Sequence, residues 1–169
     1  MVPTVTFRLL FVFVVLSHQR RRVIHFNVTA HPIRSGRHVK SPRPSLGIVP
    51  RYLLHDRDSI YGNSFRQPVR EVGSNEVLTA PRSPWQSPFV ERRIGSIRRE
   101  CLDHVIVFNE ASLRQTLKSY FRYYESSRTH LSLAKDTPEE RAVQPPALGP
   151  VIVLPEVGGL HHRYERRAA

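Results

Sequence analysis

The stretch SPWQSPFVERRIGSIRRECLDHV, residues 83–105, contains the signals of an amphipathic helix. Ser87 stands before Pro88, and a serine N-cap followed by a first-turn proline is typical of a helix start. Apolar side chains then recur at helical spacing and predict one buried face: Val90, Ile94, Ile97 and Cys101. Glu91 and Arg98 lie two turns apart on a different face of the same predicted helix.

A second helix is predicted from about residue 111 to residue 126, with Asn109 as its cap. Its buried stripe is expected to consist of Leu113, Leu117, Tyr120, Phe121 and Tyr124. Beyond Asp136 the chain is rich in proline. We therefore expect residues 144–169 to form a mostly extended tail with a basic end.

The N-terminal part of the chain shows strand patterns. Residues 9–16, LLFVFVVL, are an apolar run that indicates a buried strand. Residues 23–28 alternate in character, as expected for a half-buried strand that pairs with the first one. The link SHQR, residues 17–20, suits a hairpin turn.

The middle of the chain begins with residues 32–50, a proline-rich basic segment that favours neither helix nor strand. A short strand is predicted over residues 52–54, a weak helix over 64–73 and another short strand over 75–81. This order of elements predicts an α/β domain built on a mixed sheet.

The composition points to an anionic partner. The chain has 169 residues, a formal net charge of +12 and a pI near 11.0, so nucleic acid is the leading candidate and an anionic membrane surface the second. The eight-residue apolar run at 9–16 is too short to span a bilayer, which takes about 20 residues, and its flanking charges do not suit a secretory signal. A single cysteine, Cys101, excludes an intramolecular disulfide and favours a reducing compartment.

Two carboxylates are candidates for a metal site. Asp56 is the first acidic residue of the chain and follows a predicted strand, whereas Glu91 lies on the predicted helix. A carboxylate at a strand end and another on a facing helix could share a divalent ion such as Mg²⁺. Alternatively, Asp56 caps a turn and Glu91 stabilises the helix start through the macrodipole. Spacing alone favours this second, structural interpretation.

Three segments carry a family resemblance: RYLLHDRDSIYGNSF (51–65), VLTAPRSPWQSPFVERRIGSIRRECLDHV (77–105) and YFRYYESSRTHLSLAKDTPEERAV (120–143). In this order they resemble the integrase catalytic core of bacterial insertion-sequence transposases, the Asp-Asp-Glu class. The resemblance implies a ribonuclease-H-like mixed sheet flanked by helices. Asp56 matches the second family aspartate and Glu91 the glutamate, and the 34 residues between them are typical of the family.

The resemblance implies a concrete activity, in which Mg²⁺ or Mn²⁺ held by Asp56, Glu91 and a further aspartate supports DNA strand transfer during DNA integration. It also implies a homo-oligomer, a location in the bacterial cytoplasm with the nucleoid, and no association with a membrane. Four basic side chains near Glu91 are expected to contact DNA phosphates: Arg92, Arg93, Arg98 and Arg99. The alternative for these arginines is a solvated helix face.

The sequence departs from the family pattern in three respects. No Asp or Glu precedes Asp56, so the first family aspartate has no counterpart, and MVPTVTF (1–7) resembles the family sequence just after it. Relatives carry a helix where residues 32–50 are proline-rich, and Ser87 replaces a common asparagine. We therefore expect residues 1–143 to form an incomplete, N-terminally truncated core that has lost its first inter-strand helix and is inactive.

Two further interpretations and two aromatic side chains complete the expectations. A non-catalytic basic protein that binds DNA, or one associated with RNA, would also explain the charge. Trp85 and Tyr61 could stack on exposed bases, but both are expected to pack in the core. His130 is expected to serve in packing or in a phosphate contact. The pair His161 and His162 has no nearby partners in the sequence that would form a metal site.

Overall fold

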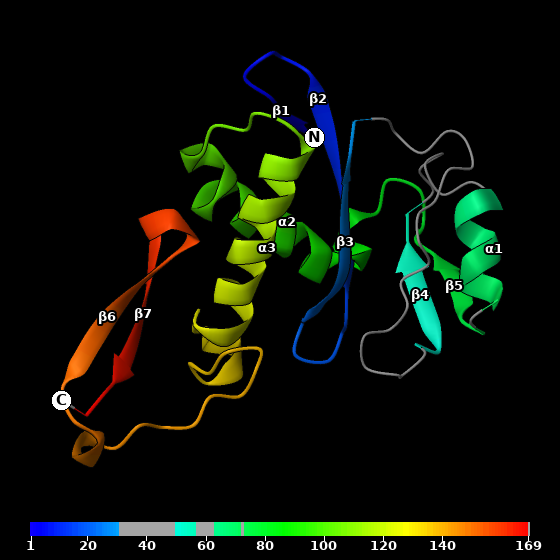
Figure 1. Cartoon of the computed structure of the whole chain (residues 1–169). Coiled ribbons are helices and arrows are strands. Elements are labelled where there is room, and N and C mark those ends of the chain that lie inside the picture. The colour runs from blue at the N-terminus through cyan, green and yellow to red at the C-terminus, as the bar shows by residue number, and fades with distance from the viewer. Residues whose placement is uncertain (31–49, 57–62, 72, 169) are drawn as a thin grey trace.

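The protein is a mixed α/β structure, as the sequence predicts. A computed structural model describes residues 1–30, 50–56, 63–71 and 73–168, so residues 32–49 of the predicted irregular segment lie outside the described residues. In chain order the elements are β1 (Val2–Pro3), β2 (Leu9–Leu16), β3 (Val23–Thr29), β4 (Tyr52–His55), α1 (Asn63–Glu71), β5 (Asn75–Leu78), α2 (Pro88–Glu100), α3 (Glu110–Ser126), β6 (Val151–Glu156) and β7 (His161–Arg166) (Figure 1).

The predicted N-terminal hairpin is confirmed. β2 and β3 pair antiparallel from Phe11 opposite Thr29 to Leu16 opposite Val23, and β1 adds two residues at the other edge of β2. The link between the strands contains two residues with positive φ, Arg20 at 51° and Arg21 at 57°. This turn points the arginine side chains of the link toward the helical half of the chain, where their partners lie.

The second sheet is small and separate. β4 pairs parallel with β5, and α1 connects the two strands. Among the described residues the strands form three sheets, β1-β2-β3, β4-β5 and β6-β7, in place of the one mixed sheet that was predicted. β1 is only two residues long, so it offers little edge for a further strand. The presence of both helices and strands confirms the α/β class. The ribonuclease-H-like sheet remains a prediction.

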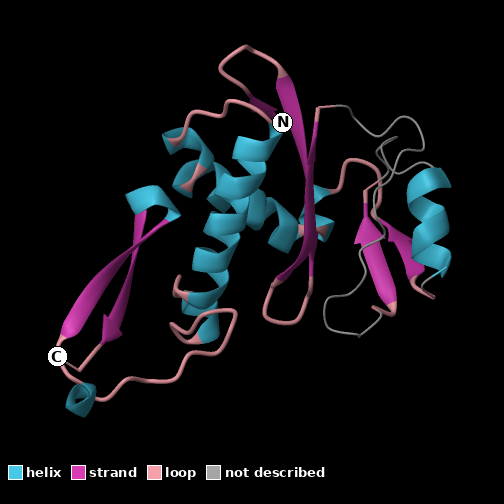
Figure 2. Cartoon of the chain, in the orientation of Figure 1, coloured by secondary structure: helices cyan, strands magenta, loops and turns pink. Residues whose placement is uncertain are grey.

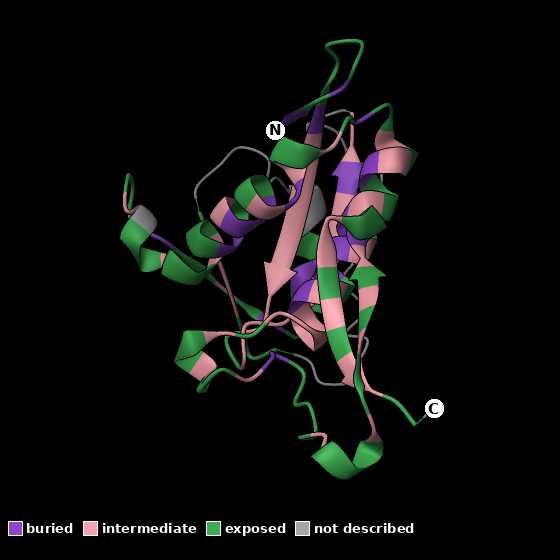
Figure 3. Cartoon of the chain, turned by 90° about the vertical axis from the view of Figure 1, so that its left-hand side faces the viewer, coloured by how far each residue is buried: buried purple, intermediate pink, exposed green. Residues whose placement is uncertain are grey.

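The core lies between α3, α2 and the first sheet. α3 buries the stripe predicted from the sequence: Leu113, Leu117, Tyr120, Phe121 and Tyr124. Its cap is Asn109, whose side chain accepts a hydrogen bond from the Ser112 amide at 2.9 Å. Phe26 of β3 meets Phe121 edge to face, with ring centroids 5.0 Å apart. Figure 3 shows the buried positions gathered where the helices meet this sheet.

The buried face of α2 differs from the predicted one. Ile97 and Cys101 are buried as expected, but Ile94 is 43% exposed and Arg93 is 2% exposed. The cause is Tyr124 of α3, because the Arg93 guanidinium carbon lies 3.5 Å from the centroid of that ring. A cation stacked on an aromatic ring is compatible with burial, so the helix turns Arg93 inward and Ile94 outward.

The C-terminal residues form a hairpin where an extended tail was expected. β6 and β7 pair antiparallel from Val151 opposite Arg166 to Glu156 opposite His161. The turn of the hairpin lies beside α3 (Figure 2). Val157 in this turn is buried, and the His161 ring stacks on Tyr123 with 4.3 Å between ring centroids. Across the described ranges, no helix is both long enough and apolar enough to cross a lipid bilayer.

Candidate nucleic-acid interface

The two candidate carboxylates both lie at the surface. Asp56 is exposed and directly follows β4, and its backbone carbonyl oxygen lies 2.7 Å from Nδ1 of His55. Glu91 is exposed in the first turn of α2. Ser87 precedes this turn as predicted, although its side chain makes no capping hydrogen bond. The predicted strand end and helix start therefore carry the predicted acids.

These acids do not form part of a larger ligand cluster. Within the ranges that the structure describes, no group of three or more His, Cys, Asp or Glu side chains converges on a point that could hold a metal ion. Paired metal ions in phosphodiester chemistry need several carboxylates to hold them. The side chains of the described residues therefore do not fit a two-ion site.

The four arginines near Glu91 divide into two kinds. Arg92, Arg98 and Arg99 are exposed on α2, whereas Arg93 is buried. Burial lowers the pKa of Arg93, while Tyr124 and Glu125 act in the opposite direction. Arginine nevertheless keeps its charge in proteins. The exposed three remain candidates for phosphate contacts, whereas Arg93 has a packing contact with Tyr124 that the sequence did not predict.

A cluster of ionic side chains ties the end of α2 to the end of α3. Arg128 donates from Nε and Nη2 to the two carboxylate oxygens of Glu100, each at 2.7 Å, and the Tyr120 hydroxyl donates to Glu100 at 3.0 Å. Burial alone would raise the pKa of Glu100, but Arg128 and the Tyr120 hydroxyl hold it below its ordinary value. His130 lies beside this pair, with Nδ1 3.0 Å from Nη1 of Arg128.

The turn between β2 and β3 clamps the segment that follows α3. Arg20 donates to the Asp136 carboxylate at 2.6 Å, to the Thr137 carbonyl at 2.7 Å and to the Pro138 carbonyl at 2.8 Å. The two segments are more than a hundred residues apart in the sequence. No local pattern signals such a contact, which is why the sequence reasoning did not identify it.

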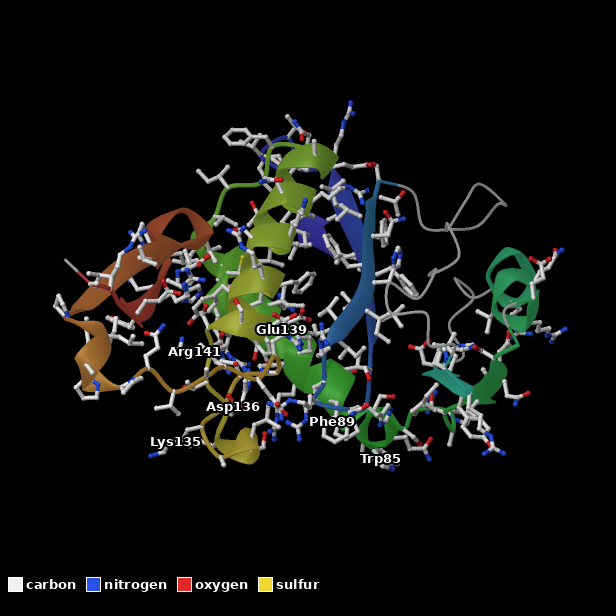
Figure 4. The ribbon with its side chains drawn as sticks, turned by 60° about the horizontal axis from the view of Figure 1, so that its bottom comes forward. Trp85, Phe89, Lys135, Asp136, Glu139 and Arg141 are labelled. Atoms are coloured by element: carbon white, nitrogen blue, oxygen red, sulfur yellow. The ribbon has the colours of Figure 1, made fainter. Side chains whose placement is uncertain are left out.

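Aromatic side chains lie at the start of α2. Trp85 is 71% exposed, although the sequence reasoning expected it in the core. The Arg21 guanidinium carbon lies 4.3 Å above the Phe89 ring. Figure 4 shows Trp85 and Phe89 along the lower rim of the view, on the side where Lys135 and Asp136 of the segment after α3 extend. Tyr61, the second aromatic residue considered above, lies outside the described residues.

The middle of the chain is similar to a known protein family. Residues 73–138 match the integrase core domain family. No curated protein and no solved structure matches the chain. The matched region contains β5, α2 and α3 together with Glu91, and it ends within the segment that Arg20 clamps. It is therefore an integrase catalytic-core-like region, as two of the three quoted segments predicted, whereas Asp56 precedes it.

Proposed function

We propose that the protein binds duplex DNA through the integrase-core-like region and does not catalyse strand transfer. The observation that carries the proposal is the exposed arginine surface of α2, Arg92, Arg98 and Arg99, inside the region that matches the family. These side chains provide exposed positive charges that neutralise backbone phosphates without reading bases. A net charge of +12 supports the same assignment.

The acids of the chain argue against catalysis. Asp56 and Glu91 are the two carboxylates that the family pattern retains, and no acidic residue of the sequence precedes Asp56. Two metal ions at a phosphodiester repel one another, and carboxylates offset that repulsion. Because the residues of this sequence supply two of these carboxylates, Asp56 and Glu91, we expect this chain to bind DNA without metal-dependent joining. By the same resemblance we infer a homo-oligomer in the bacterial cytoplasm, associated with the nucleoid.

The proposal is tested with purified full chain in two assays. Fluorescence anisotropy of labelled duplexes of unrelated sequence should show comparable affinities, because phosphate contacts carry no sequence information. A joining assay with labelled donor ends and Mg²⁺ or Mn²⁺ should show no product. Metal-dependent joining that is abolished by Glu91→Gln would overturn the inactive assignment, and failure to bind any duplex at low salt would overturn the DNA assignment.

A further inference from the structure

A basic cavity lies where the β2–β3 turn, α2, the end of α3 and the segment after it meet. Its volume is about 240 Å³. That is below the range of about 300–1,000 Å³ for pockets that bind drug-sized ligands, so the cavity suits a small ion. Four arginines line it: Arg21, Arg92, Arg93 and Arg128. Among the described residues of its lining, none is acidic.

The carboxylates whose charges act on Arg93 and Arg128 already accept hydrogen bonds. Glu100 accepts two hydrogen bonds from Arg128 and a third from Tyr120. Glu125, whose charge acts on Arg93, accepts a hydrogen bond from the Val23 amide at 2.6 Å. Positive charge in the cavity therefore exceeds the negative charge that the surrounding side chains supply.

Arg93 provides an independent sign of a missing ligand. Its side chain is held on both sides of the guanidinium group, because Nη2 donates to the Arg21 carbonyl and the ring of Tyr124 lies against Cζ. Its Nη1 is buried and has no hydrogen-bond partner among the described residues. A buried charged donor without an acceptor is unfavourable. An anion in the cavity that Arg93 lines would supply the acceptor.

The other arginines are placed to complete such a site. Arg21 is oriented by its stack on Phe89 and by a hydrogen bond from Nη1 to the Ser132 hydroxyl at 3.2 Å. Arg92 is exposed, also lines the cavity, and directly precedes Arg93 on α2. Guanidinium groups donate several hydrogen bonds in a fixed geometry that matches the oxygens of a phosphate.

We propose that this cavity binds one phosphate group, with Arg21 and Arg92 as outer donors and Arg93 as the inner donor. The inference goes beyond the proposed function, because it assigns a discrete oxyanion site that depends on neither Asp56 nor Glu91. The phosphate comes from one of two sources that share this chemistry, a phosphodiester of a nucleic acid backbone or free inorganic phosphate.

The test is calorimetric titration of the full chain with inorganic phosphate, against chloride at the same ionic strength. We expect saturable binding by the wild-type chain and at least about tenfold weaker binding, about 1.4 kcal/mol, by the double variant Arg21→Gln with Arg92→Gln. The control variant Arg70→Gln with Arg122→Gln removes the same number of exposed positive charges outside the cavity lining, and it should bind phosphate as the wild type does. Thermal melts of each variant check that the chain remains folded.

The outcomes separate this site from the proposed function. Absence of saturable phosphate binding, or an equal loss in the control variant Arg70→Gln with Arg122→Gln, would overturn the phosphate site even if the protein still binds DNA. Phosphate binding that the double variant loses supports the site even if DNA does not bind. Competition between inorganic phosphate and a labelled duplex at constant ionic strength then identifies the backbone as the source, and its absence identifies free phosphate.

Discussion

His130 lies with its Nδ1 3.0 Å from Nη1 of Arg128, a group that can only donate, so Nδ1 accepts and the imidazole is neutral. Burial and the Arg128 charge lower the pKa of His130 to about 4. In the unfolded chain a histidine titrates near its ordinary pKa of about 6.5. Between these values the unfolded chain binds more protons than the folded one, so stability falls as pH decreases from about 6.5 toward 4.

We therefore expect His130→Gln to reduce the loss of melting temperature between pH 7 and pH 5. Some loss should remain, because burial and Arg114 also lower the pKa of His25. The exposed His162 serves as the matched control, and His162→Gln should keep the full wild-type pH dependence. Melts that change equally with pH in the wild type and in His130→Gln would contradict the assignment.

Cys101 has no exposed surface, and burial raises the pKa of its thiol to about 11. Because the thiolate is the reactive form, we expect a thiol-specific disulfide reagent at pH 8 to label Cys101 slowly in the folded chain. Addition of denaturant should make labelling rapid and stoichiometric. Rapid labelling under native conditions would show that the contact between α2 and α3 around Cys101 opens easily.

Residue by residue, sequence patterns predicted local features better than distant partners. The five buried side chains of α3 and its Asn109 cap follow from helical spacing and capping chemistry, and the structure confirms them. Arg93 could not be assigned in this way, since its burial depends on the ring of Tyr124, thirty-one positions further along the chain. Spacing placed Arg93 among the charged neighbours of Glu91, but spacing contains no information about what faces it.

At the scale of elements, α3 holds β3 at both ends. The Ala30 amide donates to Glu110 and the Val23 amide donates to Glu125, each at 2.6 Å. These bonds satisfy strand amides with carboxylates from the first and last turns of the helix. The strand and the helix were each predicted from their own periodicity, whereas this pairing required the tertiary arrangement.

The Arg20 clamp is the element-scale contact whose loss should be most visible. Arg20→Ala removes hydrogen bonds to two backbone carbonyls and to Asp136, and its side chain is only 30% exposed. We expect a loss of about 1–3 kcal/mol in the free energy of unfolding, measured by urea denaturation. Arg22→Ala breaks a single ion pair, with Glu139, whose two side chains are more exposed to solvent. This variant should lower the free energy of unfolding by at most about 1 kcal/mol. Equal effects of the two variants would contradict the clamp.

The C-terminal hairpin shows why some elements were missed. Residues 151–156 and 161–165 alternate between exposed and half-buried positions, but Pro155 and the glycine pair at 158–159 concealed the strand pattern in the sequence. Val157 adopts a positive φ of 53° in the turn, which is unusual for a β-branched residue. The packing of His161 and Val157 against α3 stabilises the hairpin, and no local signal anticipates that packing.

For the whole molecule, the sequence predicted the α/β class and the integrase-core-like region, while the separate sheets and the basic cavity emerged only from the structure. The class follows from the order of strand and helix patterns. Whether the strands join one sheet or several depends on pairing between segments that are far apart in the sequence, so local patterns do not determine it. The net charge of +12 is a property of the whole sequence. It supports the central claim, which is DNA binding through phosphate contacts.

The most direct test of that claim is the salt dependence of duplex binding, measured by anisotropy over a range of KCl concentrations. The logarithm of the affinity falls linearly with the logarithm of the salt concentration, and each lost phosphate contact reduces the magnitude of this slope by about one. We expect the triple change of Arg92, Arg98 and Arg99 to Gln to lower the slope by about three. The matched triple change of the exposed Arg70, Arg122 and Arg141 should leave it nearly unchanged. Affinity that hardly varies with salt, or equal slopes for the two triple variants, would contradict the account.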